Sequence, residues 1–160
     1  MASPRSDGSV TIVKFNDDGD PIGHTSLPKL SRGDAEWKEI LSPLAYEVTR
    51  HQGTELACSV PGYDRHEEGL YRCICCDNAL FSSKTKYDSG TGWPSFAQPI
   101  ASENIQTETD TTLGMTRTEV RCKLCDAHLG HVFDDGPGST GLRYCMNTVA
   151  LRFVPARQRT

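Results

Sequence analysis

The 160-residue chain has no long apolar run and no cluster of charges of one sign. No segment approaches the roughly 20 apolar residues that a membrane-spanning helix needs, so we expect no membrane partner. The 17 basic and 21 acidic side chains are dispersed and give a net charge of −4. Because nucleic acids are bound through clustered Lys and Arg, this pattern also argues against nucleic acid as a partner.

The N-terminus lacks the features of a targeting segment. Residues 1–8 contain no apolar stretch like that of a secretory signal, and Asp17, Asp18 and Asp20 are unusual in a transit peptide. We therefore expect a reducing, cytoplasmic location. In that setting the seven cysteines are more often metal ligands or reactive thiols than a disulfide framework.

The organisation of the chain changes near residue 30. Residues 1–30 are polar, and we expect a mobile N-terminal arm with at most one short strand, Val10 to Phe15. Residues 31–160 form the expected domain, which begins with two short helices. Asp34 is the expected cap of the first, in which Trp37, Ile40 and Leu41 share one face, and Ser42-Pro43 opens the second.

Beyond residue 53, short apolar runs alternate with clusters of Gly, Pro, Asp and Ser. The runs are Gly69–Arg72, Arg117–Arg121, Gly141–Met146 and Thr148–Val154. This alternation is typical of short antiparallel strands joined by long turns. The sequence therefore predicts a mainly β domain that follows a short helical segment.

Four cysteines form two Cys-x-x-Cys pairs, Cys73 with Cys76 and Cys122 with Cys125. Two such pairs can enclose one tetrahedral Zn²⁺, and a closed four-sulfur site has no open position for a substrate. We therefore expect one structural zinc ion that adds folding free energy. The alternative is that the pairs are redox dithiols or ordinary buried thiols.

Cys145 is the strongest candidate for a reactive thiol. In an extended segment, residues two apart point to the same side, so Arg143 and Asn147 share a face with Cys145. An adjacent cation lowers the pKa of a thiol and raises the fraction of thiolate. The alternative is that Cys145 is an inert buried cysteine.

Two further motifs allow several interpretations. His128 and His131 could be acid/base groups near Cys145, structural side chains, or ligands of a second metal together with Asp134 and Asp135. The glycine-rich run around Trp93 lacks the context of a phosphate loop. It is a tight turn that presents Trp93 to a site or packs it in the core.

Taken together, the chain resembles the B-type methionine sulfoxide reductases, which act on the R epimer. The resemblance extends from about residue 33 to residue 155. It is carried by Arg50-His51-Gln52-Gly53-Thr54-Glu55, Cys73-Ile74-Cys75-Cys76, Ser89-Gly90-Thr91-Gly92-Trp93-Pro94-Ser95-Phe96, Cys122-Lys123-Leu124-Cys125, Ala127-His128-Leu129-Gly130-His131-Val132-Phe133 and Gly141-Leu142-Arg143-Tyr144-Cys145-Met146-Asn147.

The resemblance implies two antiparallel sheets that meet like a tent, with short N-terminal helices and a zinc site far from the active site. It also implies a role for each motif residue: Cys145 as nucleophile, His128, His131 and Asn147 around the sulfoxide, Trp93 and Phe133 as the wall for its methyl group, and Arg143 favouring the thiolate. We nominate His131 as the acid that protonates the sulfoxide oxygen.

Recycling must differ from that of many family members, because Thr91 replaces their resolving cysteine. Cys75 lies inside a zinc knuckle, whereas Cys58 lies in a Gly- and Pro-containing loop that could move to meet a sulfenic acid. We therefore expect a Cys58–Cys145 disulfide, although direct reduction by external thiols is an alternative. The expected partners are oxidised proteins and a dithiol reductant such as thioredoxin, and we expect a monomer.

The sequence also bears on two other functional classes. A non-catalytic zinc-knuckle interaction module would be expected to lack both the face formed by Arg143, Cys145 and Asn147 and the His pair. A thioredoxin-like oxidoreductase would place a Cys-x-x-Cys pair in a βαβ pattern, and neither pair has one.

Overall fold

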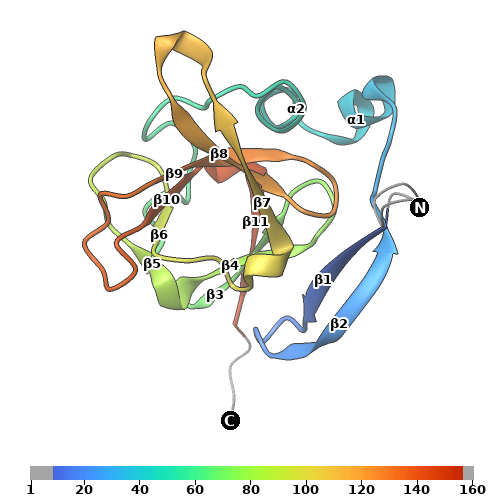
Figure 1. Ribbon diagram of the computed structural model, residues 1–160, viewed down its shortest axis with the longest axis horizontal. Coiled ribbons are helices and arrows are strands. Elements are labelled where there is room, and N and C mark those ends of the chain that lie inside the picture. Colours follow the sequence, from blue (N-terminus) through green and yellow to red (C-terminus); the bar gives the residue numbers. More distant parts are fainter. Residues whose placement is uncertain (1–8, 157–160) are drawn as a thin grey trace.

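The computed structural model describes residues 9–156, apart from the side chain of residue 113; the remainder of the expected arm and the last four residues lie outside it. Antiparallel strands dominate the regular structure of the described chain, which has only two short α-helices, and this confirms the mainly β class (Figure 1). The elements are β1 Ser9–Phe15, β2 Pro21–Pro28, α1 Asp34–Ile40, α2 Pro43–Arg50, β3 Gly69–Cys73, β4 Ala79–Ser82, β5 Lys86–Tyr87, β6 Ser95–Phe96, β7 Ile105–Asp110, β8 Arg117–Cys122, β9 His128–Phe133, β10 Arg143–Met146 and β11 Leu151–Pro155.

The strands form three antiparallel sheets (Figure 1). The largest has six strands in the order β5-β6-β10-β9-β8-β7, and a smaller one has the order β11-β3-β4. The family resemblance implies two antiparallel sheets, and these two larger sheets correspond to them. Strands β1 and β2 form a separate hairpin.

Aromatic side chains join the two larger sheets. The rings of Phe81 on β4 and Phe96 on β6 stack with centroids 4.4 Å apart, and Tyr71 on β3 meets Phe96 edge-on at 5.1 Å. Val120 and Leu129, from β8 and β9, complete this core and are fully buried. The core thus holds β9 and β10, the strands that carry the candidate site.

The N-terminal arm contains more structure than the sequence predicts. A second strand, β2, pairs with β1, so the expectation of at most one strand is wrong. The side chains of β2 are largely exposed, which leaves no apolar alternation to detect. Ile12 on β1 is buried, and the hairpin is therefore part of the packed molecule.

The helices follow the prediction with one correction. Ser42 caps α2 through a hydrogen bond from the N–H of Ala45, with Pro43 in the first turn as expected. The cap of α1 is Gly33 rather than Asp34, whose carboxylate instead accepts hydrogen bonds from other side chains. Ile40 is half exposed, because this short helix buries only Trp37.

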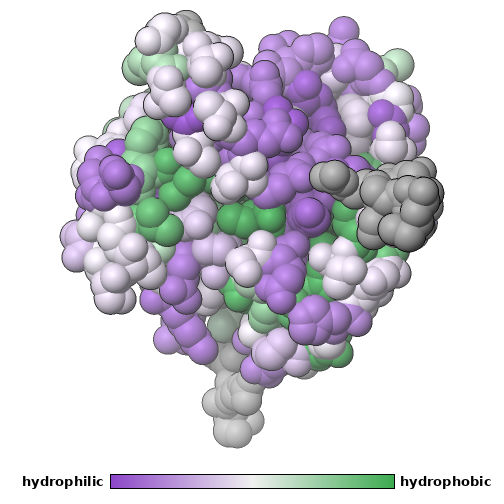
Figure 2. Space-filling model, viewed as in Figure 1, coloured by the Kyte–Doolittle hydropathy of each residue, from purple (hydrophilic) through white to green (hydrophobic). Residues whose placement is uncertain are grey.

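The surface carries both hydrophilic and apolar side chains. In the space-filling view, hydrophilic side chains cover the region of the helices, and apolar side chains reach the surface over parts of the larger sheets (Figure 2). Among residues 9–156, no helix has the length and apolar character needed to cross a membrane.

Candidate functional site

The two cysteine pairs converge on one point between the larger sheets. The sulfur atoms of all four cysteines lie within 4.8 Å of one another. Cys73 Sγ lies 3.6 Å from Cys125 Sγ, and Cys76 Sγ lies 3.5 Å from Cys122 Sγ. Because a tetrahedral zinc site with Zn–S bonds of about 2.3 Å separates its sulfurs by about 3.8 Å, this set fits a four-coordinate metal.

The two pairs have the same local geometry. In each, the N–H of an aspartate donates to the carbonyl of the first cysteine at 2.9 Å, from Asp77 to Cys73 and from Asp126 to Cys122. Both aspartates have positive φ, 67° and 64°. Two turns with the same hydrogen bond and similar backbone conformation, at the ends of β3 and β8, thus direct four thiols to a common centre.

Cys145 lies in the middle of the large sheet. It is the register partner of Ser95 on β6 and of His131 on β9. The close approach of β9 to β10 requires a glycine, because a Cβ on Gly130 would lie 2.1 Å from the carbonyl oxygen of Cys145. Register partners of an antiparallel pair project to the same face, so His131 and Cys145 lie side by side.

The electrostatics of Cys145 only partly match the prediction. Burial raises the pKa of the thiol, whereas the Arg143 guanidinium and the Thr91 hydroxyl lower it to a smaller extent. Arg143 is well held: it donates to both oxygens of Asp135, at 2.9 and 3.1 Å, and stacks 4.4 Å from the Phe133 ring centroid. The expected cation is therefore present, but it does not outweigh burial.

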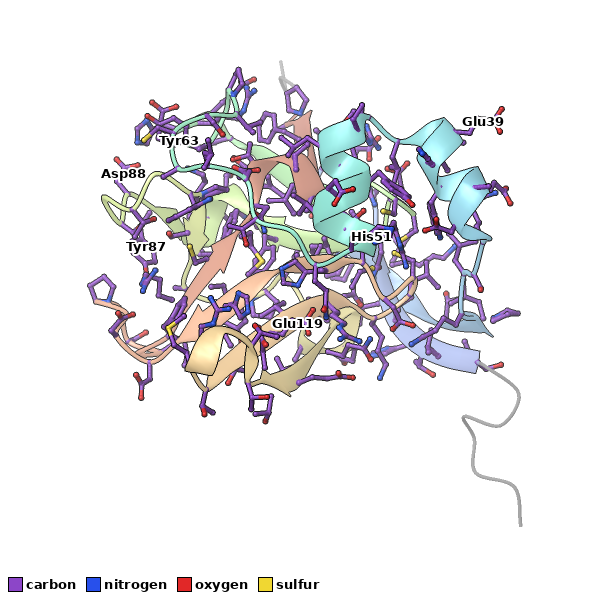
Figure 3. The ribbon with its side chains drawn as sticks, turned by 90° about the horizontal axis from the view of Figure 1, so that it is seen from above. Glu39, His51, Tyr63, Tyr87, Asp88 and Glu119 are labelled. Atoms are coloured by element: carbon purple, nitrogen blue, oxygen red, sulfur yellow. The ribbon has the colours of Figure 1, made fainter. Side chains whose placement is uncertain are left out.

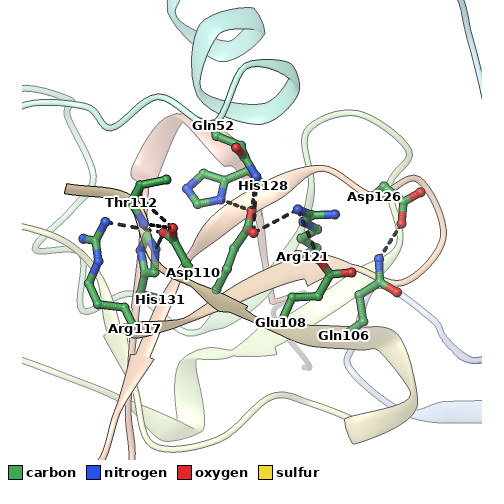
Figure 4. Close-up of polar contacts among 11 residues, drawn as sticks. Gln52, Gln106, Glu108, Asp110, Thr112, Arg117, Arg121, Asp126, His128 and His131 are labelled. Atoms are coloured by element: carbon green, nitrogen blue, oxygen red, sulfur yellow. Dashed lines mark hydrogen bonds and ion pairs between the residues drawn. The ribbon is translucent and has the colours of Figure 1, made fainter. Parts of the chain in front are cut away.

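Each of the two histidines contacts a carboxylate (Figure 4). His128 Nδ1 lies 2.6 Å from Glu119 Oε2, and His131 Nε2 lies 2.8 Å from Asp110 Oδ2. The two imidazole rings meet edge to face with centroids 5.4 Å apart. Both histidines thus lie on β9, the strand that pairs with β10 and Cys145, and each contacts a different carboxylate.

The carboxylates are ionised for identifiable reasons. Burial alone would raise the pKa of Glu119, but hydrogen bonds from Arg121 and His128 outweigh burial and lower it. The hydrogen bond from His131 holds the pKa of Asp110 well below its usual range. Burial lowers the pKa of His128, although Glu119 acts in the opposite direction, so His128 favours the neutral form.

Asn147 holds a neighbouring loop in place. Its Oδ1 accepts from the N–H of Glu55 at 2.9 Å, and its Nδ2 donates to the carbonyl of Leu129 at 3.0 Å. The Trp93 indole in turn donates to the Glu55 carbonyl at 3.0 Å. Asn147 therefore positions Trp93 through Glu55. Both the oxygen and the nitrogen of its side-chain amide are hydrogen-bonded to backbone groups.

Sequence reasoning missed three acidic residues of this region, Glu55, Asp110 and Glu119. Glu55 is buried, accepts from the N–H of Val149 at 2.9 Å, and leaves Oε2 without a partner among the described residues. All three lie far from Cys145 in the chain, and no local spacing distinguishes them from surface acids.

The loop that carries Cys58 packs on the turn that carries Thr91. The N–H of Cys58 donates to the carbonyl of Gly92 at 2.8 Å, and a Cβ on Gly92 would lie 2.8 Å from the Cys58 sulfur. Gly92 has φ +90°, so both its conformation and this contact favour glycine. Cys58 is exposed, and the hydroxyl of Thr91, the residue before Gly92, contacts the Cys145 thiol.

Cys75 lies elsewhere, beside the four-cysteine cluster. Its Sγ lies 3.4 Å from the hydroxyl of Thr49 on α2, and it is half buried. The seven cysteines are all free thiols.

A small cavity of about 150 Å³ adjoins Trp93. Its walls include Tyr63, Tyr87 and Asp88, which lie at one edge of the molecule in the view from above (Figure 3).

Comparison with known proteins gives a consistent result. Residues 41–155 match the SelR domain family. A peptide methionine sulfoxide reductase MsrB of Thioalkalivibrio sulfidiphilus is 56% identical over 125 residues, which cover 78% of this chain and 91% of that protein. A mitochondrial methionine-R-sulfoxide reductase B2 of Danio rerio is 50% identical over 140 residues, covering 82% of this chain and 78% of the relative.

Proposed function

The chain belongs to the SelR family of B-type methionine sulfoxide reductases, and on that basis we propose that it reduces methionine-R-sulfoxide, mainly in proteins, with Cys145 as the nucleophile. The observation that carries the proposal is the register contact that sets Cys145 beside His131 on the face that also holds Arg143.

In the reductive step, the Cys145 sulfur attacks the sulfur of the sulfoxide while an acid protonates the sulfoxide oxygen. The oxygen passes to Cys145, which becomes a sulfenic acid, and the substrate leaves as methionine. His131 is the proposed acid, with His128 close to the same oxygen. Trp93 and Phe133 would form an apolar wall for the methyl group, which cannot compete for hydrogen bonds to the oxygen.

In the recycling step, the Cys58 thiol attacks the sulfenic acid, a disulfide forms and water leaves. A dithiol protein of the thioredoxin type then reduces this disulfide. Support comes from the exposure of Cys58 and from its contact with the Thr91–Gly92 turn, which borders Cys145. Cys75 is the weaker candidate because it lies beside the metal cluster.

The four-cysteine cluster would hold one Zn²⁺ with a structural role, since all four coordination positions are taken by protein sulfur. We further propose a monomeric enzyme in the reducing cytoplasm, which suits its free thiols. The proposed division is an arm of residues 1–30 and a catalytic domain of residues 31–160.

Separated epimers of a methionine sulfoxide peptide test the activity. With dithiothreitol as reductant, we expect methionine from the R epimer and none from the S epimer. Cys145→Ser should abolish turnover while leaving the fold and metal content intact. Residual turnover within about tenfold of wild type, roughly 1.4 kcal/mol in barrier, would contradict the assignment of the nucleophile.

A further inference from the structure

The two histidines use different ring nitrogens to contact their carboxylates, Nδ1 in His128 and Nε2 in His131 (Figure 4). An ionised carboxylate only accepts hydrogen bonds, so the ring nitrogen that faces it must carry the proton. His131 therefore carries its proton on Nε2, toward Asp110, and His128 carries its proton on Nδ1, toward Glu119. In the neutral ring, His131 keeps Nδ1 as a free proton acceptor.

The two oxygens of Asp110 have separate tasks. Oδ1 accepts from the N–H and the hydroxyl of Thr112, at 2.9 and 2.7 Å, and closes the turn after β7. Oδ2 accepts from His131 at 2.8 Å and from Arg117 at 3.4 Å. The side chains of Asp110 and His131 are largely buried, with 14% and 12% exposed, so this contact is shielded from water.

The thiol next to this pair needs a base. Nucleophilic attack uses the thiolate, and burial disfavours the Cys145 thiolate more than Arg143 favours it, so a neighbouring proton acceptor would assist the ionisation. His131 is the cross-strand neighbour of Cys145. The other acidic group near the histidines, Glu119, is already engaged by His128 and Arg121.

We propose that Asp110 is a positioning residue that completes a Cys145–His131–Asp110 relay. Asp110 holds His131 with its proton on Nε2, so that Nδ1 takes the proton of the Cys145 thiol. The S–H bond breaks, its electron pair remains on sulfur for the attack, and the imidazolium gives the same proton to the sulfoxide oxygen. Asp110 stabilises the transient imidazolium and stays ionised. This proposal rests on the proposed reductase function.

Asp110→Asn is the decisive variant. The Asn oxygen can still close the turn with Thr112, but its amide N–H would face His131 Nε2, which must then be an acceptor. The imidazole proton moves to Nδ1, where the ring can no longer accept the thiol proton. A wrong histidine tautomer of this kind costs about 10⁴-fold in the serine proteases, and we expect a loss of about 10² to 10⁴-fold in the single-turnover rate of methionine release.

The spectroscopic readout is the tautomer of His131, measured by ¹⁵N NMR of the imidazole. We expect the Nε2–H form in wild type and a shift toward Nδ1–H in Asp110→Asn. Thr112→Val, which removes one hydrogen bond of the turn and leaves the contact with His131, should change neither the tautomer nor the rate by more than about threefold. Glu103→Gln, which removes the partner of the exposed His24 far from the site, is the matched carboxylate control.

The outcomes separate this proposal from the proposed function. A wild-type protein that releases no methionine from the R epimer refutes the reductase. If wild type is active, an Nδ1–H tautomer of its His131 overturns the relay, and this measurement stands even if Asp110→Asn fails to fold. A folded Asp110→Asn protein that reduces the R epimer within threefold of the wild-type rate also overturns it.

Discussion

At the scale of single residues, the reactivity of Cys145 depends on two opposing effects on the pKa of its thiol. Burial raises the pKa of the thiol, and the guanidinium of Arg143 lowers it. Arg143 is held by Asp135 and by the Phe133 ring, so its charge stays close to the sulfur. A fixed cation matters here because the thiolate is otherwise poorly solvated in a half-buried strand.

Removing that charge should shift the pH dependence of thiol reactivity. In Arg143→Leu, the thiolate loses its cation, so the pKa of Cys145 rises and alkylation by iodoacetamide requires a higher pH. We expect a shift of roughly one pH unit. Arg143→Lys retains the charge without the planar fork and should shift the profile less. An alkylation profile of Arg143→Leu that coincides with wild type would show that this charge does not govern the thiol.

At the scale of structural elements, one buried side chain forms three hydrogen bonds between the N-terminal hairpin and the domain, in addition to the apolar packing of Ile12. The Asn104 amide accepts from the N–H of Val13 and donates to the carbonyls of Val13 and Ala79, all at 2.8 Å. It thereby connects β1 to β4 across a large separation in sequence. These groups have no access to water, so each bond must be made within the protein.

Asn104→Ala should therefore weaken the attachment of β1 to the domain. We expect the free energy of unfolding to fall by about 2–4 kcal/mol, because buried backbone groups lose their partners. Amide hydrogens of β1 should exchange faster, which hydrogen-exchange mass spectrometry can measure. Thr11→Ala, on the exposed side of the same hairpin, is the control and should change stability by less than about 0.5 kcal/mol. Unchanged exchange in β1 of Asn104→Ala would contradict this role.

The loop from Gly53 to Gly62 is the second element with a specific prediction. After one turnover on the R epimer without reductant, mass spectrometry should find a peptide that joins Cys58 to Cys145. Cys58→Ser should spare this first turnover but reduce cycling with thioredoxin by about tenfold or more. Cys75→Ser is the matched control, since it removes a thiol beside the metal cluster, and should cycle normally. A Cys58→Ser enzyme that cycles like wild type would assign recycling to external thiols.

At the scale of the whole molecule, the four-cysteine cluster joins the two larger sheets. Cys73 ends β3 of the smaller sheet, and Cys122 ends β8 of the larger sheet. A metal bound by both pairs would therefore hold the two larger sheets together. Because ligands of a structural metal are brought together only on folding, metal binding adds to the free energy of folding.

Elemental analysis should find one zinc ion per chain. Cys122→Ser should lose the metal and unfold at a temperature lower by roughly 10 °C or more, while the remaining folded protein still releases methionine in a single turnover. Cys75→Ser should retain both the metal and the unfolding temperature. A folded wild-type preparation that contains no metal would refute the zinc site.

Local spacing was enough to predict much of the site. The Cys-x-x-Cys pairs, the strand period that links Arg143 to Cys145, and the Ser42-Pro43 helix start all depend on residues close together in the chain. Short-range geometry of this kind follows from backbone period and turn chemistry. The family resemblance added the roles of His131 and Trp93, which spacing alone left open.

Only the tertiary structure decided which carboxylates contact the histidines. It also decided how strongly burial opposes the effect of Arg143 on the pKa of Cys145. Asp110 reaches His131 through the pairing of β7 with β8 and of β8 with β9, and no sequence interval encodes that path. The pKa of Cys145 likewise depends on how much water the packed strands exclude. The hairpin strand β2 was missed for the same reason: it is held by backbone pairing to β1, and its exposed side chains carry no apolar pattern.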